Sequence, residues 1–192
     1  MPMLIPTIKN ANPIRLLAWG AALLLWLLPA IAMQFTAEVN WTALDFTVFA
    51  VMIGSVGLAL DRLVHLSANA SFRLASIALM FTSFLLIWVN LAVGIIGGDS
   101  EPLNLLYALV LVAGAGMAWA GRFTPNAMLK CCLSMAVTQS VITLVAIILG
   151  WGQPYSTPMM LFIGNGIFIL GFLTAGALFY HAARGDFPAK TD

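Results

Sequence analysis

Charged residues are scarce in this sequence. They make up 8% of the 192 residues, whereas about 25% is usual for a soluble domain. The hydrophobic content of 62% also exceeds the roughly 45–50% of soluble domains. So few charges cannot cover a water-facing surface, and a disordered chain would need far lower hydrophobicity. The composition therefore excludes both classes and predicts an integral membrane protein.

Cysteine is scarce, and neither positive nor negative charges are in large excess. The two cysteines, Cys131 and Cys132, are adjacent and so lack the spacing of a zinc site or of a disulfide framework. Eight Lys and Arg against seven Asp and Glu give a net charge of +1, without the basic surplus that nucleic acid requires. We expect no metal site and no nucleic-acid partner.

Long apolar runs are plentiful. Crossing a bilayer takes about 20 apolar residues in a helix. Six segments qualify, with bounds near 16–35, 44–63, 74–96, 103–120, 128–149 and 159–180. Ala30-Ile31-Ala32 also fits a signal-peptide cleavage site, but we interpret the first segment as a transmembrane helix. The prediction is an all-α, six-helix transmembrane bundle, with residues 1–192 forming one domain.

The positive charges all fall on one side of the predicted membrane, because the connections between successive helices alternate between its two sides. Every cation falls at a terminus or in the second or fourth connection: Lys9, Arg15, Arg62, Arg73, Arg122, Lys130, Arg184 and Lys190. The positive-inside rule assigns that side to the cytoplasm, so both termini are expected there.

The returning helices carry evenly spaced glycines. Gly57, Gly116 and Gly176 stand 59 and 60 residues apart. This spacing is typical of three αα-hairpins that repeat one unit, although any alternating six-helix protein shows some periodicity.

Polar residues within the predicted helices are neutral. Asn90, Gln139 and Asn165 lie well inside three different segments, whereas every ionisable residue lies near a helix end. Side-chain amides at this depth serve as interhelical hydrogen bonds or line a small polar cavity for a quinone headgroup, a pigment or a solute. The lack of a buried charge argues against ion-coupled transport.

The other side of the membrane is predicted to be acidic. Glu38, Asp45, Asp99 and Glu101 fall in or beside the first and third connections. Short loops between apolar helices need such charges for solvation, and carboxylates also bind hard cations or a partner protein. Both interpretations stay open.

Histidines could in principle hold a haem. His65 and His181 both lie at helix ends. Haem there would be poorly enclosed, so we disfavour it and predict no cofactor.

Several strings resemble a group of small bacterial inner-membrane proteins with no assigned activity. They are Glu38–Thr42 (EVNWT), Asp45–Phe46, Trp88–Gly97 (WVNLAVGIIG) and Asn104–Tyr107. The likeness extends over five of the six predicted helices. It implies a bacterial cytoplasmic membrane and adds no mechanism.

The features together favour a protein without catalysis. We expect a non-catalytic accessory or assembly subunit of a larger membrane complex, respiratory or photosynthetic. The alternative is a small channel or transporter for a neutral solute, with a polar path through Asn90, Gln139 and Asn165. An enzyme is disfavoured because the segments contain no acid–base pair at bilayer depth.

Overall fold

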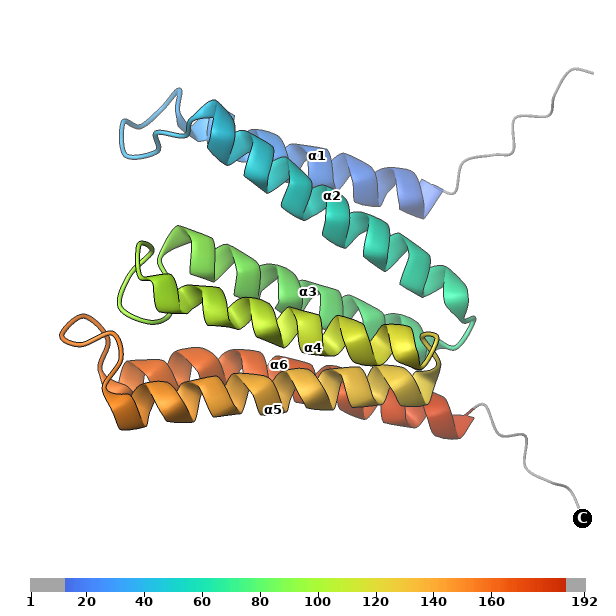
Figure 1. Cartoon of the computed structure of the whole chain (residues 1–192). Helices are drawn as coiled ribbons and strands as arrows, with labels where there is room; N and C mark the ends of the chain where they lie inside the picture. Colours follow the sequence, from blue (N-terminus) through green and yellow to red (C-terminus); the bar gives the residue numbers. More distant parts are fainter. Residues whose placement is uncertain (1–12, 186–192) are drawn as a thin grey trace, which may run out of the picture. The chain divides into compact units, whose positions relative to one another are not determined.

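The computed structural model describes residues 13–185, in which all regular structure is helical (Figure 1). The six α-helices are α1 (Pro13–Ala32), α2 (Ala43–Leu66), α3 (Ala70–Ala92), α4 (Tyr107–Ala120), α5 (Pro125–Leu149) and α6 (Pro158–Gly185), and a 3₁₀ helix, η1 (Pro102–Leu106), precedes α4. Each α-helix, with η1 counted as part of the fourth span, is long and apolar enough to cross a membrane. The predicted fold class, all-α with six candidate transmembrane helices, is confirmed.

The chain divides into two compact units between Asp61 and Arg62. The first contains α1 and most of α2, and the second contains α3 to α6. The interpretation of the whole chain as one domain stays a prediction.

Within the second unit, α3 to α6 form an up-and-down four-helix bundle. The strongest contacts join α5 to α6, α4 to α5 and α3 to α6, whereas α3 and α4 contact each other little. Sequential hairpins therefore do not describe the packing of α3, which lies mainly against α6. The three glycines of the suggested repeat also differ in surroundings. Gly57 faces Trp19, Gly176 faces Cys132, and Gly116 faces nothing within 4 Å.

The bundle places large apolar side chains outside and several polar ones inside. Leu144, Ile148, Phe162 and Ile167 are all more than half exposed. Ser76, Gln139 and Asn165 are completely buried, together with Phe172 and other apolar residues. This distribution suits helices surrounded by lipid, where apolar surface needs no cover and polar groups must be satisfied internally.

The third helix ends earlier than predicted. The sequence suggested a helix to Ile96, but α3 ends at Ala92. Gly94 and Gly97 take positive φ values of 69° and 70°, which turn the chain away from the helix axis. The hydrophobic run continues past this point, so periodicity alone could not place the end. The first helix is likewise shifted, to 13–32 instead of 16–35.

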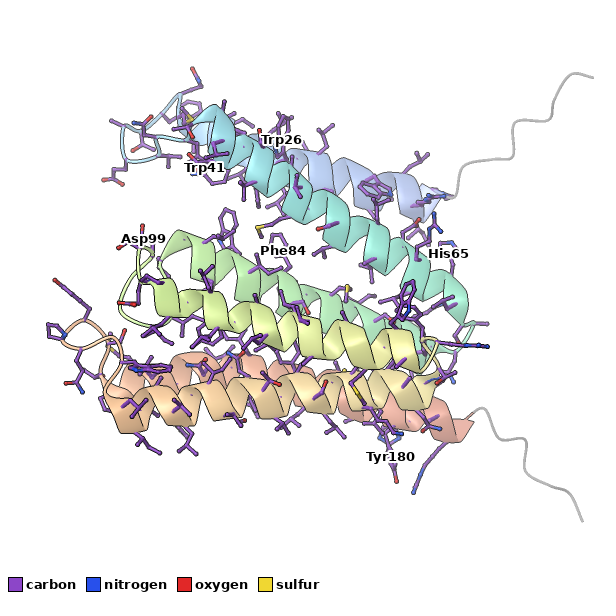
Figure 2. All side chains as sticks on the ribbon, viewed as in Figure 1. Trp26, Trp41, His65, Phe84, Asp99 and Tyr180 are labelled. Atoms are coloured by element: carbon purple, nitrogen blue, oxygen red, sulfur yellow. The ribbon has the colours of Figure 1, made fainter. Side chains whose placement is uncertain are left out.

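The ends of the four-helix bundle differ in charge. Arg73 and Arg184 lie near the start of α3 and the end of α6, and Arg122 and Lys130 lie around the turn between α4 and α5. Asp99 lies in the loop at the opposite end (Figure 2). Of the predicted cations, Lys9 and Lys190 lie outside the described residues. The separation of charge within this unit follows the antiparallel order of its helices.

Candidate functional site

Two of the three predicted amide residues meet between α5 and α6. Gln139 Nε2 donates a hydrogen bond to Asn165 Oδ1 at 2.7 Å, and both residues are fully buried. Asn165 Nδ2 in turn donates to the Leu161 carbonyl of its own helix at 2.8 Å. Asn165 lies seven residues after the start of α6, so it stands about 10 Å along that helix. The pair therefore joins the two helices in the interior of the bundle.

A third side chain reaches the same place from α4. Tyr107 is the first residue of α4, is 3% exposed, and interacts with the Asn165 side chain. The Tyr107 hydroxyl is buried beside that side chain without a well-formed hydrogen bond to it. The sequence interpretation did not assign Tyr107 to a site. Its position near the start of the fourth apolar run gave no signal of a buried hydroxyl. We call Tyr107, Gln139 and Asn165 the polar triad.

Asn90 does not join this triad through any hydrogen bond of the described residues. Its Nδ2 donates to the Leu86 carbonyl of its own helix at 2.8 Å, and its Oδ1 is buried without a partner. The polar path predicted from three amides thus has one connected pair, and Asn90 remains a separate polar position near the end of α3.

Two polar residues, in η1 before α4 and in the loop before α6, hold the turn that follows α3. Asn104 Oδ1 accepts from the amides of Ile95 and Ile96 at 3.0 and 2.9 Å, and its Nδ2 donates to the carbonyls of Ile96 and Gly98. Ser156 Oγ accepts from the Gly97 amide at 2.9 Å. These bonds pair the backbone N–H and C=O groups of a non-helical turn. Such groups would have no hydrogen-bond partner in the hydrocarbon of a membrane. We call Asn104 and Ser156 the loop clamp.

The loop clamp requires close approach of two chain segments. Gly152 has a φ of 82°, and a Cβ there would lie 2.6 Å from the Gly97 amide nitrogen. A glycine is therefore needed at this position both for its conformation and for its lack of a side chain. The sequence interpretation missed the clamp, because the pairing of residues 59 apart leaves no local pattern.

Two of the four acidic residues predicted for one face stabilise the backbone next to them. Asp45 Oδ2 accepts from the amide and the hydroxyl of Thr42 at 2.7 and 2.8 Å, beside the start of α2. Glu101 caps η1 by accepting from the Leu103 amide at 3.4 Å. Glu38 and Asp99 are exposed. A cation or partner surface formed by these four stays a prediction. Within residues 13–185, no group of three or more His, Cys, Asp or Glu could hold a metal ion.

Histidines and cysteines occupy contrasting surroundings. His65 and His181 are exposed, and the His181 ring lies edge-on to Tyr180 at 6.0 Å between centroids. Figure 2 labels His65 and Tyr180. Cys131 and Cys132 are free and buried in the bundle, where Cys131 Sγ lies 3.9 Å from Met135 Sδ. Neither histidine is enclosed, as the expectation against haem supposed. That expectation stays a prediction.

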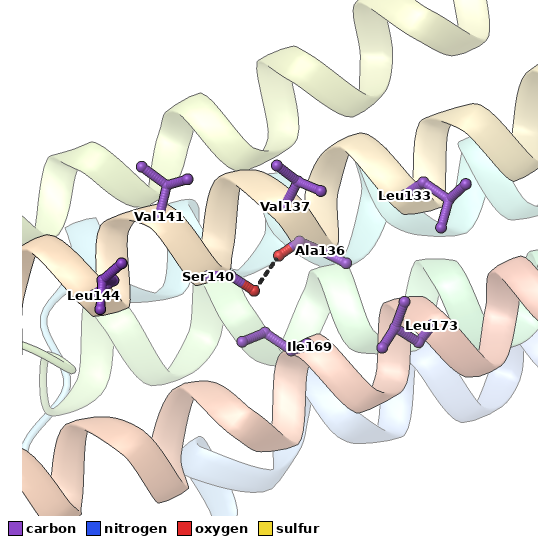
Figure 3. Close-up of a pocket in the computed structure, with 8 residues that line it drawn as sticks. All are labelled: Leu133, Ala136, Val137, Ser140, Val141, Leu144, Ile169 and Leu173. Carbon is purple, nitrogen blue, oxygen red and sulfur yellow. Dashed lines mark hydrogen bonds between the residues drawn. The ribbon is translucent and has the colours of Figure 1, made fainter.

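An open groove runs along α5 and α6 away from these polar residues (Figure 3). It has a volume of about 290 Å³, and seven of the eight side chains that line it are apolar. Its one polar residue, Ser140, donates to the Ala136 carbonyl at 2.8 Å, so its hydroxyl is already satisfied. The groove thus offers apolar surface suited to lipid rather than a continuation of the polar triad.

Comparisons with family models, with curated proteins and with solved structures each find no match to this chain. The resemblance seen in its sequence therefore identifies no family. The structure supports an integral membrane protein with six apolar helices.

Proposed function

We propose that this chain is a non-catalytic accessory or assembly subunit of a larger complex in the bacterial cytoplasmic membrane, such as a respiratory or photosynthetic assembly. One observation carries the proposal. The amides best suited to bind a solute, Gln139 and Asn165, are bonded to each other and fully buried. An interhelical hydrogen bond of this kind stabilises a transmembrane bundle by about 0.6–2 kcal/mol, which favours a packing role.

Open glycines on the surface of the helices support association with another membrane protein. A Cβ at Gly116, Gly164 or Gly166 would meet nothing within 4 Å. Glycine allows the backbones of two transmembrane helices to approach closely, and such contacts drive association where lipid removes the hydrophobic driving force. A helix of a neighbouring subunit fits this chemistry.

Extraction in a mild detergent tests the proposal. The chain, tagged at its C-terminus in its native membrane, is expected to migrate in native electrophoresis with a complex far larger than its own 20.5 kDa. Crosslinking in intact membranes before extraction guards against dissociation by the detergent. A species that contains this chain alone under both conditions would contradict an accessory role.

The alternative function, a path for a neutral solute, has its own support. Asn90 Oδ1 and Gln139 Oε1 are buried without hydrogen-bond partners, so each has an unused acceptor for a polar molecule. An Asn90→Leu, Asn165→Leu double variant separates the two functions. A path lined by these amides predicts loss of solute uptake in vesicles while the chain still assembles. Assembly with unchanged uptake would exclude the path.

We also propose that both termini lie in the cytoplasm. The support is the positive-inside rule applied to Arg73, Arg122, Lys130 and Arg184, which share one end of the bundle. Fusion of a fluorescent protein and of alkaline phosphatase after residue 192 tests this orientation. Fluorescence without phosphatase activity is expected, and the reverse pattern would contradict it.

A further inference from the structure

The apolar groove along α5 and α6 has the length of one lipid chain (Figure 3). On α5 it extends from Leu133 to Leu144, which lie about 16.5 Å apart along the helix axis. The hydrocarbon layer of a bilayer is about 30 Å thick, so each of its two leaflets contributes about 15 Å. The length and the apolar lining of the groove therefore match a single acyl chain from one leaflet.

A positive charge precedes the groove on α5. Lys130 stands three residues before Leu133 and seven before Val137, and both of these line the groove. Residues at this spacing share one face of a helix, so Lys130 lies on the groove face of α5. Its side chain is exposed. Because helical side chains tilt toward the N-terminus of their helix, the ammonium group is directed past the end of the groove.

A second cation and a tyrosine follow the groove on α6. Tyr180 lies seven residues after Leu173 and eleven after Ile169, the two residues of α6 that line the groove. Arg184 Cζ lies 4.4 Å from the centre of the Tyr180 ring, so the guanidinium is held back toward the groove. Tyr180 lies on the outside of the bundle (Figure 2). Lys130 and Arg184 thus flank the same end of the groove, one on each helix.

No acidic residue of the described bundle balances these two cations. Neither Lys130 nor Arg184 forms a salt bridge within residues 13–185. The two carboxylates of residues 62–185 belong to Asp99 and Glu101, in the loop at the opposite end of the bundle. The end of the groove is therefore positive, and a negatively charged headgroup complements it.

We propose that the groove binds an anionic phospholipid, with one acyl chain between α5 and α6 and the phosphate beside Lys130 and Arg184. Ammonium and guanidinium groups form charge-assisted hydrogen bonds with phosphate oxygens, and tyrosine rings favour the depth of the headgroups. The apolar lining alone would accept any lipid, so the two cations make the site selective for negative charge. This site goes beyond the proposed accessory role and holds whether or not the chain has a partner protein.

Native mass spectrometry of the full chain in detergent micelles tests the headgroup site. Dioleoylphosphatidylglycerol, which is anionic, and dioleoylphosphatidylcholine, which has the same acyl chains but no net charge, are added in equal amounts. The anionic lipid is expected to bind about tenfold more tightly, because each Lys or Arg near a negative headgroup adds attraction. Equal binding of the two lipids overturns the proposal.

Charge variants locate the headgroup. The Lys130→Gln, Arg184→Gln double variant is expected to bind the two lipids equally. The Arg73→Gln, Arg122→Gln double variant is the matched control, because it removes two cations from the same end of the bundle but neither lies on α5 or α6. All four side chains are exposed, so both variants should fold. A preference that survives in the first variant, or is lost equally in both, overturns the headgroup site.

A larger side chain in the groove tests the acyl-chain site. Ser140→Leu fills the groove and is expected to lower binding of both lipids severalfold. Thr174→Leu is the matched control, because Thr174 is also exposed and donates to a carbonyl of its own helix, that of Leu170, but does not line the groove. Unchanged binding in Ser140→Leu overturns the proposal. A lipid-free dimer that Ser140→Leu abolishes would also overturn it, since a second copy of the chain would then occupy the groove.

Discussion

The α1–α2 hairpin is held by large aromatic side chains and an ion pair, whereas the α3–α6 bundle is held by small residues and buried amides. In the hairpin, Trp26 Nε1 donates to the Phe46 carbonyl at 2.9 Å, and the Trp41 ring contacts Phe46 and Phe49 edge-on. Arg15 pairs with Asp61 at 3.0 Å. Three residues are buried between positions 13 and 61, namely Pro29, Phe49 and Met52.

The bundle depends instead on close approach. Gly171 faces Thr82, and Gly114 faces Met135 and Cys131. Glycine at these positions lets neighbouring helices pack with their side chains against backbone, which strengthens van der Waals contact where the hydrophobic effect does not act. The difference indicates that the bundle tolerates changes in side-chain volume poorly, while the hairpin depends on a few individual contacts.

The largest expected effect is that of adding a methyl group inside the bundle. A Cβ at Gly171 would lie 2.6 Å from Thr82 Oγ1, and Thr82 is β-branched and cannot turn aside. Gly171→Ala is expected to lower the free energy of unfolding by about 1–3 kcal/mol, measured by denaturant titration in detergent micelles. Gly164→Ala on the same helix is the control, because its Cβ meets nothing within 4 Å. Equal losses in the two variants would refute close packing at Gly171.

The interhelical amide pair comes next. Asn165→Leu leaves Gln139 Nε2 without its acceptor and is expected to cost about 1–2 kcal/mol in the same titration. Asn90→Leu should cost less, because Asn90 bonds only within its own helix. Adding Gln139→Leu to Asn165→Leu should recover part of the loss, since both partners are then apolar. A larger cost at Asn90 would show that the pair does not hold α5 to α6.

The hairpin is tested through its indole hydrogen bond. Trp26→Phe keeps a ring but removes the donor to Phe46, so about 1 kcal/mol of local stability should be lost. Hydrogen exchange of the α1 and α2 amides should accelerate, while that of α5 and α6 stays unchanged. Trp119→Phe, at a ring that is 78% exposed, is the control. Faster exchange throughout the chain would mean that hairpin and bundle unfold together.

The ion pair should have the smallest effect. Arg15 is 56% exposed and Asp61 14%, so solvent screens much of their attraction. Asp61→Asn is expected to cost less than about 1 kcal/mol, and the difference from the unaltered chain should shrink as salt rises. Hydrogen exchange near the start of α1 at two salt concentrations measures this. A difference that salt leaves unchanged would point to packing rather than charge.

Much of this architecture could be predicted from composition and the lengths of apolar runs. All six helices were predicted, because a bilayer imposes a minimum length that hydropathy records directly. The end of α3 was misplaced because Val93, Ile95 and Ile96 are apolar but belong to a turn fixed by Asn104. That turn depends on side-chain hydrogen bonds to backbone, which apolar periodicity does not encode.

The candidate site was predictable only in part. The sequence singled out Gln139 and Asn165 because amides at bilayer depth are costly without partners, and the structure joins these two. It also singled out Asn90, which has the same chemistry but faces its own helix. Tyr107 could not be found, since aromatic residues are common at membrane boundaries and nothing local marks one that turns inward.

The shortness of α4 bears on the lipid around it. Its 14 residues reach about 21 Å, whereas the hydrocarbon layer is about 30 Å thick. The missing length is supplied by η1 and by the turn that Asn104 closes, whose polar backbone is already bonded. With η1 the fourth span reaches about 31 Å and matches the hydrocarbon layer, whereas the 28 residues of α6 reach about 42 Å. The excess length of α6 is expected to be accommodated by tilt or by placement of its last turns, which contain His181 and Arg184, in the headgroup region.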